Sequence, residues 1–118
     1  MDSLRSVLEQ VARDVEPQVR AQLGGFFGGM VRAYLPQTWV FRTEREVASL
    51  TVGGDGGVAV ADGAAATPDV TIESTAQHLT AALTARSRSK VPRGALHVTA
   101  HTPKGQTAFD YLRGRLGL

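Results

Sequence analysis

The sequence predicts an α+β domain in which helices cover one face of a five-stranded, mainly antiparallel sheet. Short segments between residues 37 and 101 alternate apolar with polar residues, which is the pattern of half-buried strands. Segments at both ends of the chain instead repeat their apolar residues every three or four positions, which is typical of amphipathic helices. At 118 residues we expect a single domain, with N-terminal helices over 1–35 and the sheet and closing helices over 37–118.

Two helices are expected before the sheet. Ser3 is a suitable N-cap for the first, which we expect to end before Pro17, because the residue preceding a proline disfavours the helical region. The second is expected from Pro17 to about Leu35. Four glycines around Phe26-Phe27 cost this helix about 3–4 kcal/mol in propensity. They indicate a broken helix, the close approach of another backbone, room for a ligand, or a need to flex.

Four strands are expected next, as a meander. In the first, Trp39 and Phe41 point to one face of the sheet while Val40 and Arg42 point to the other. A tight hairpin is expected at Gly53–Gly57, because Asp-Gly supplies the positive φ angles that such turns require. The remaining strands of the meander are expected at Val47–Val52, Val58–Ala61 and Val70–Glu73.

A helix, a strand and a last helix are expected to complete the domain. Ser74 to Gln77 has the spacing of a capping box and predicts a helix start. Leu96–His101 alternates like a strand, and Thr102-Pro103 then offers an N-cap followed by a proline at the first helical position. The last helix carries three apolar residues on one face: Phe109, Leu112 and Leu116.

Composition excludes several functions. The chain has no cysteine, so disulfides, thiol catalysis and cysteine-ligated zinc are ruled out. Its N-terminus lacks the apolar core of a signal peptide, and the charge-free stretch Ala21–Val31 is far shorter than the ~20 residues that span a bilayer. We therefore expect a soluble, cytoplasmic protein. Seven bases and one acid follow residue 80, so one end of the molecule is expected to attract anions.

No pattern of residues indicates catalysis, so we predict a protein that is not an enzyme and has no catalytic residue and no cofactor. On a strand, His97 and His101 would be ~13 Å apart, too far to share one metal ion, and no metal site is predicted. Gly53–Gly57 lacks the Lys-Ser/Thr ending of a phosphate loop. No aromatic residues interleave with the bases of 86–93, so nucleic acid is not an expected partner.

Three segments resemble the sterol carrier protein type 2 domain family. Leu50–Val58 is similar to the family's meander strand with its glycine-rich hairpin. Pro68–Thr75 is similar to its Pro-Asp-Val strand, which leads into a helix through a hydroxyl cap. Gly94–Val98 is similar to its glycine-led strand before the last helix. The resemblance covers roughly residues 39–118 and, more loosely, the N-terminal helices.

The resemblance implies an apolar tunnel between sheet and helices that binds a lipid of the fatty acyl, sterol/isoprenoid or quinone type without chemistry. Family members bind sterols, fatty acids, acyl-CoA or phospholipids, and some prokaryotic relatives are accessory proteins in ubiquinone synthesis. The last helix would act as a lid. Apolar residues suited to such walls would equally fill an ordinary core; they are Phe26, Phe27, Met30, Trp39, Phe41, Leu79, Leu83, Phe109, Leu112 and Leu116.

The alternative hypothesis is an accessory or interaction module, either a homodimer or a partner subunit in lipid or quinone metabolism, with a filled core and no ligand. The glycine-flanked Phe26-Phe27 pair favours it. A run of basic residues lies between the helix that begins near Ser74 and the last strand. It is expected to be either a solvated loop or a transient docking surface for an anionic membrane. Its members are Arg86, Arg88, Lys90 and Arg93.

Overall fold

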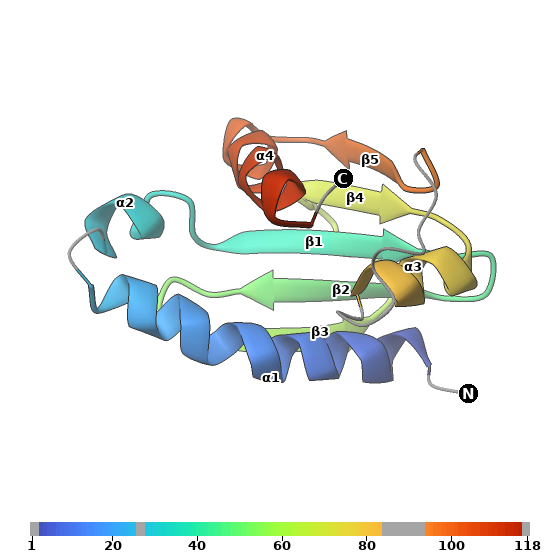
Figure 1. Cartoon of the computed structure of the whole chain (residues 1–118), viewed down its shortest axis with the longest axis horizontal. Helices are drawn as coiled ribbons and strands as arrows, with labels where there is room; N and C mark the ends of the chain where they lie inside the picture. The colour runs from blue at the N-terminus through green and yellow to red at the C-terminus, as the bar shows by residue number, and fades with distance from the viewer. Residues whose placement is uncertain (1–2, 26–27, 84–93, 117–118) are drawn as a thin grey trace.

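The computed structural model describes residues 3–25, 28–83 and 94–116, with the side chains of these ranges except at 30–31 and 111–116. Its strands form one five-stranded sheet in the order β3-β2-β1-β4-β5. Neighbouring strands are antiparallel except β1 and β4, which run parallel. This confirms the predicted fold class (Figure 1). The strands are β1 (Gln37–Arg42), β2 (Val47–Val52), β3 (Val58–Asp62), β4 (Val70–Glu73) and β5 (His97–Ala100).

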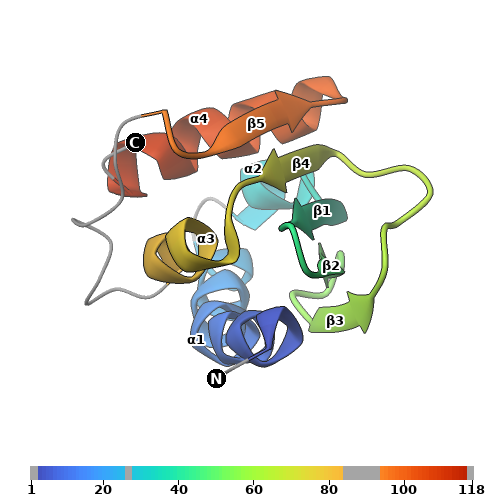
Figure 2. The ribbon, with the colours of Figure 1, turned by 90° about the vertical axis from the view of Figure 1, so that its right-hand side faces the viewer.

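The helices gather on one face of this sheet, as Figure 2 shows. They are α1 (Leu4–Leu23), α2 (Gly28–Arg32), α3 (Ala76–Leu83) and α4 (Pro103–Leu116). The strand register puts the apolar residues of every strand in rows on that face: Phe41 lies opposite Ala48 and Ile72, and Ile72 lies opposite Val98. The alternation in the sequence therefore identified the covered face correctly.

The prediction that Pro17 divides two long helices was wrong. α1 continues through Pro17 to Leu23 as one helix of 20 residues. Leu4 and Leu8 belong to the core, Val11 and Ala12 pack against it, and beyond Pro17 the side chains of Arg20 and Leu23 lie beside Gly56 of the β2–β3 hairpin, so packing on both sides of the proline outweighs the local preference. Pro17 has no N–H to donate to the carbonyl of Arg13, four residues earlier in the helix. Because Arg13 and Pro17 are both exposed, water can bind to that carbonyl oxygen instead.

The glycine-rich region contains a helix end and a short helix rather than a long second helix. Gly24 is the C-cap of α1, and its N–H donates to the carbonyl of Arg20. α2 then spans only five residues. A Cβ at Gly28 would lie 2.2 Å from the carbonyl oxygen of Leu23. Of the alternatives, a broken helix is thus the one observed, and the backbone that Gly28 approaches is the end of α1 itself.

The β2–β3 hairpin turns as predicted in position but with different angles. Only Gly56 has positive φ, at 89°, while Asp55 instead accepts a hydrogen bond from the N–H of Gly57 through its side chain. A Cβ at Gly56 would meet the Arg20 side chain at 2.9 Å, so the hairpin lies directly against the end of α1. Glycine is required here both by φ and by space.

The other face of the sheet is crossed by the connection from β3 to β4, residues 63–69 (Figure 2). Ser49 on that face donates its hydroxyl to the carbonyl of Gly63 and accepts from the N–H of Ala65. Val40 beside it is only 1% exposed. The alternation of β1 placed Val40 away from the helices, and the crossing segment explains why it is nevertheless buried.

The β1–β2 turn fixes the beginnings of two helices. The Glu46 carboxylate accepts from the N–H of Leu4 at the start of α1. The Glu44 carboxylate accepts from the N–H of Ala76 at the start of α3, 2.9 Å away. Thr75, one residue later than the expected cap, accepts from the N–H of His78. One tight turn thereby orients both helices over the sheet.

Candidate functional site

Three aromatic residues predicted as lipid contacts lie together on the helix-covered face. The ring centroids of Trp39 and Phe41 are 6.5 Å apart and stacked. Those of Trp39 and Phe109, on α4, are 6.3 Å apart and tilted by 50°. Both spacings lie within the range of favourable aromatic pairs. Strand β1 and helix α4, far apart in sequence, therefore meet through these rings.

The predicted residues of α3 have two different positions. Leu79 is 1% exposed and belongs to the closed core, together with Phe41 and Ile72. Leu83, one turn later, is only half-buried and packs against the same core from its edge. Leu79 and Phe41 are therefore core residues, while part of the Leu83 side chain remains exposed to solvent.

Five half-buried apolar side chains lie on α3, α4, β1, β5 and the residue before β5, and we call them the apolar floor. Four of them pack against the core: Trp39, Leu83, Leu96 and Val98. The fifth is Phe109, whose ring lies beside that of Trp39. β2 and β3, by contrast, pack against α1.

The other predicted site residues cannot be assigned a contact. Phe26 and Phe27 and the four bases Arg86, Arg88, Lys90 and Arg93 lie outside the described residues. Met30 in α2 and Leu112 and Leu116 in α4 lie in described helices, but their side chains are outside the description.

The first turn of α4 is fixed to the sheet by Asp69, which is 5% exposed. Its carboxylate accepts from the N–H of Thr38 at 2.9 Å and from the hydroxyl of Thr102 at 2.7 Å. Thr102 in turn accepts from the N–H of Gly105, which is the N-cap bond predicted from the sequence. A Cβ at Gly105 would lie 2.4 Å from the Asp69 carbonyl oxygen, so helix and strand are in backbone contact.

Gln37 connects this helix start to the aromatic rings. Its amide nitrogen donates to the carbonyls of Tyr34 and Lys104, at 2.8 and 3.0 Å. Its amide oxygen accepts from the indole N–H of Trp39, at 3.0 Å. Sequence reasoning missed both Gln37 and Asp69. A detectable signal existed for Gln37, because a polar residue two positions before Trp39 shares its inward face and needs buried partners.

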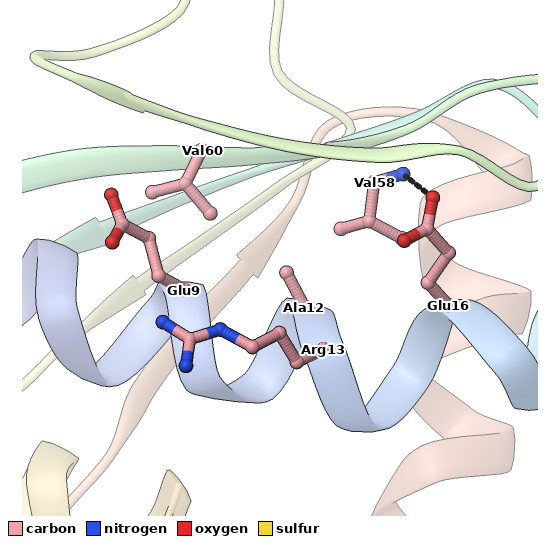
Figure 3. A pocket seen from close by; sticks show the side chains of 6 residues that line it. All are labelled: Glu9, Ala12, Arg13, Glu16, Val58 and Val60. Carbon is pink, nitrogen blue, oxygen red and sulfur yellow. Dashed lines mark hydrogen bonds between the residues drawn. The ribbon is translucent and has the colours of Figure 1, made fainter.

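A hollow lies between α1 and the edge strand β3 (Figure 3). It is an open groove of about 280 Å³, lined by Glu9, Ala12, Arg13, Glu16, Val58 and Val60. Glu16 accepts from the N–H of Val58 across it, at 3.4 Å. The residues that line it are not among the predicted lipid contacts, and its charged wall is unsuited to a lipid tail.

Two charged side chains of the described surface, Arg5 and Glu44, have shifted pKa values. Arg5 lies 3.0 Å from Glu9 and 2.9 Å from Asp62, and these contacts raise its pKa. The pKa of Glu44 is lowered because its carboxylate accepts hydrogen bonds from its own N–H and from that of Ala76. The Arg5–Glu9 pair lies within α1, and the Glu44–Ala76 bond lies at the start of α3. None of these residues belongs to the apolar floor.

Two of the three histidines, His97 and His101, lie in or directly after the last strand, on its outer side, and the third, His78, lies in α3. His97 pairs with Glu73 in the sheet register, and His101 lies 2.9 Å from the Thr71 hydroxyl through its Nε2. Within residues 3–25, 28–83 and 94–116, no group of three histidine or acidic side chains is arranged to hold a metal ion. No helix in the described part of the chain is long and apolar enough to cross a membrane.

Neither a protein-family model nor a curated protein sequence matches this chain. Solved structures do. A UbiJ-SCP2 ubiquinone synthesis protein superposes with a TM-score of 0.51 at 18% identity, covering 92% of this chain and 97% of its own. Sterol carrier protein 2 like 2 from Aedes aegypti gives a TM-score of 0.51 at 18% identity, covering 93% of this chain and 99% of its own.

A part of a larger enzyme is also similar. A double mutant of the sec-alkyl sulfatase PisA1, an enzyme of a Pseudomonas species, gives a TM-score of 0.62 at 16% identity. The match covers 94% of this chain but only 16% of the sulfatase. At such identities these likenesses establish a shared fold, and the fold is present both as a whole protein and as a segment of a longer one.

Proposed function

Since this chain has the sterol carrier protein type 2 fold, we propose that it binds and carries an apolar lipid without chemistry. The proposed ligand is of the fatty acyl, sterol/isoprenoid or quinone type and lies over the apolar floor, in a tunnel between sheet and helices. The observation that carries the proposal is that five apolar side chains on α3, α4 and the sheet stay half-buried, with the rings of Phe109 and Trp39 6.3 Å apart across α4 and β1. Apolar surface left partly uncovered in this way is what a lipid tail requires.

The energetics suit a reversible carrier. Each methylene removed from water contributes about 0.8 kcal/mol, so a tail of about ten methylenes contributes on the order of 8 kcal/mol. Ordering of the tail and of the protein subtracts from this gross value, so the net binding free energy is below about 8 kcal/mol and the Kd is micromolar or weaker. Such an affinity allows both uptake and release.

The anchoring of α4 is consistent with its proposed role as a lid. Its first turn is fixed to the sheet through Asp69 and Thr102. Farther along, the described contact with the sheet is the pair of rings Phe109 and Trp39. A helix anchored at one end and held by apolar contact along its length can admit a ligand by moving about the anchored end.

A pair of α4 variants tests this proposal. Phe109→Glu places a charge on the apolar floor, and Thr107→Glu places the same charge on the exposed side of the helix. Binding of the fluorescent fatty acid cis-parinaric acid to delipidated protein is measured. Because a buried phenyl ring contributes about 1.5–3 kcal/mol, we expect at least a roughly tenfold weaker affinity for Phe109→Glu only. Equal affinities in two folded variants would remove α4 from the site.

The same assay addresses the alternative of an accessory module with a filled core. A wild-type protein that binds no fatty acid, sterol or quinone probe, and that runs as a dimer in size-exclusion chromatography, would support the accessory module and refute the carrier.

A further inference from the structure

We propose that Gln37 is a positioning residue that fixes the Trp39 ring as one wall of the lipid site. This inference rests on the proposed function and adds to it a determinant of the shape of the site. Gln37 does not itself belong to the apolar floor: it is 5% exposed, and its polar atoms are directed at protein groups.

The side-chain amide is matched to its surroundings. A glutamine amide provides two N–H donors and one acceptor oxygen. Two carbonyls, of Tyr34 and Lys104, need the donors, and the indole N–H of Trp39 needs the acceptor. The opposite orientation of the amide would set its oxygen against both carbonyls. The three partners therefore select one orientation of the amide, and with it one position for the acceptor.

This acceptor determines how Trp39 lies. The indole N–H of the half-buried Trp39 has its partner in Gln37, which is two residues away on the same face of β1. With its N–H held, the indole lies beside two other rings, with centroid distances of 6.5 Å to Phe41 and 6.3 Å to Phe109. Without the acceptor, the ring would turn to bring its N–H to water, and the wall it presents would change.

The same amide also holds the start of α4. Lys104 is 67 residues from Gln37 in sequence, and its carbonyl belongs to the first turn of that helix. Lys104 additionally donates its ammonium group to the carbonyl of Pro36, 2.6 Å away. The orientation of Trp39 and the position of the α4 anchor are therefore set by one side chain.

Two substitutions separate these roles. Gln37→Met keeps the approximate volume but loses every hydrogen bond. Gln37→Glu keeps an acceptor for the Trp39 indole but loses the donors to the two carbonyls. Trp39 is the only tryptophan of the chain, so its emission and its quenching by acrylamide report on this ring alone. Affinity for cis-parinaric acid is measured on the same samples.

We expect Gln37→Met to shift the emission to the red, to increase quenching, and to weaken probe binding about fivefold, the equivalent of one hydrogen bond. Gln37→Glu should be less stable to heat than wild type, yet keep the wild-type emission and bind the probe within about twofold. Unchanged emission in Gln37→Met would overturn the inference. Equal loss of affinity in both variants would also overturn it, because it would assign the effect to the α4 anchor.

A measurement on the wild type covers the case in which Gln37→Met does not fold. The single indole N–H signal in a proton–nitrogen NMR spectrum should exchange slowly with solvent, and rapid exchange would refute the hydrogen bond to Gln37. Failure of wild-type protein to bind the probe would instead refute the proposed function, and with it the role of the Trp39 ring as a wall of the lipid site. The emission of the variants would still decide whether Gln37 holds the ring.

Discussion

Replacing Asp69 by alanine should be one of the most damaging single changes in this protein. The carboxylate is 5% exposed and receives hydrogen bonds from the Thr38 N–H and the Thr102 hydroxyl. Hydrogen bonds to a charged group contribute about 1.5–3 kcal/mol each, and a buried donor left without a partner costs a similar amount. Two such bonds give an expected loss of about 3–6 kcal/mol, out of the 5–15 kcal/mol typical of a domain.

The loss is measured by urea unfolding, followed at Trp39 and by circular dichroism. With a slope near 1.5 kcal/mol per molar urea, the midpoint should fall by about 2–4 M. Asp69→Asn should lose less, because an amide oxygen can still accept from Thr38. Asp62→Ala is the control: its side chain is 74% exposed and its ion pair in the described part of the chain is with Arg5, so it should cost under about 1 kcal/mol. If Asp69→Ala costs no more than Asp62→Ala, Asp69 does not anchor α4.

Three other changes test separate parts of the structure. Gly105→Ala should cost roughly 1–3 kcal/mol in urea unfolding, because its Cβ would lie 2.4 Å from the Asp69 carbonyl oxygen. Glu44→Gln should reduce stability at neutral pH, because the Glu44 pKa is lowered from 4.5 by bonds including that from Ala76 N–H, and the deficit should vanish as pH falls through the folded pKa. Replacing four bases by glutamine should weaken binding to anionic vesicles by about 1 kcal/mol per base. These bases are Arg86, Arg88, Lys90 and Arg93.

Each of these has its own control. Gly29→Ala, with nothing within 4 Å of the added Cβ, should leave stability unchanged or raise it, and an equal loss at Gly105 and Gly29 would contradict the contact with Asp69. For Glu44, a carboxylate that is favoured in the folded state stabilises above its unfolded pKa and not in acid. A deficit that persists at low pH would therefore contradict its assigned role. Neutral vesicles serve as the reference for the four bases, and equal binding to both would exclude a charged docking surface.

Local pattern predicted the sheet well because its two faces differ. Alternation placed Trp39 and Phe41 on the helix side, and a one-residue shift would have exposed the whole apolar row. The N-cap at Thr102 was equally predictable, since hydroxyl, proline and the first turn are contiguous. Such features depend on neighbours within a few residues.

Features that depend on distant partners could not be predicted in the same way. Pro17 should end a helix locally, but α1 is held by its packing along the sheet and continues. Asp69 resembles an ordinary turn residue, yet Thr38 and Thr102 reach it from 31 and 33 residues away. The burial of Val40 required knowing that residues 63–69 cross the outer face. Of the candidate site, sequence therefore supplied the aromatic residues and missed the polar groups that position them.

Native mass spectrometry of the purified protein, followed by solvent extraction and lipid analysis, tests lipid carriage most directly. We expect a stoichiometric lipid that leaves the protein on extraction, returns when a fatty acid, sterol or quinone is added, and is lost in Phe109→Glu. A bare protein mass that does not change on adding any of the three would contradict it.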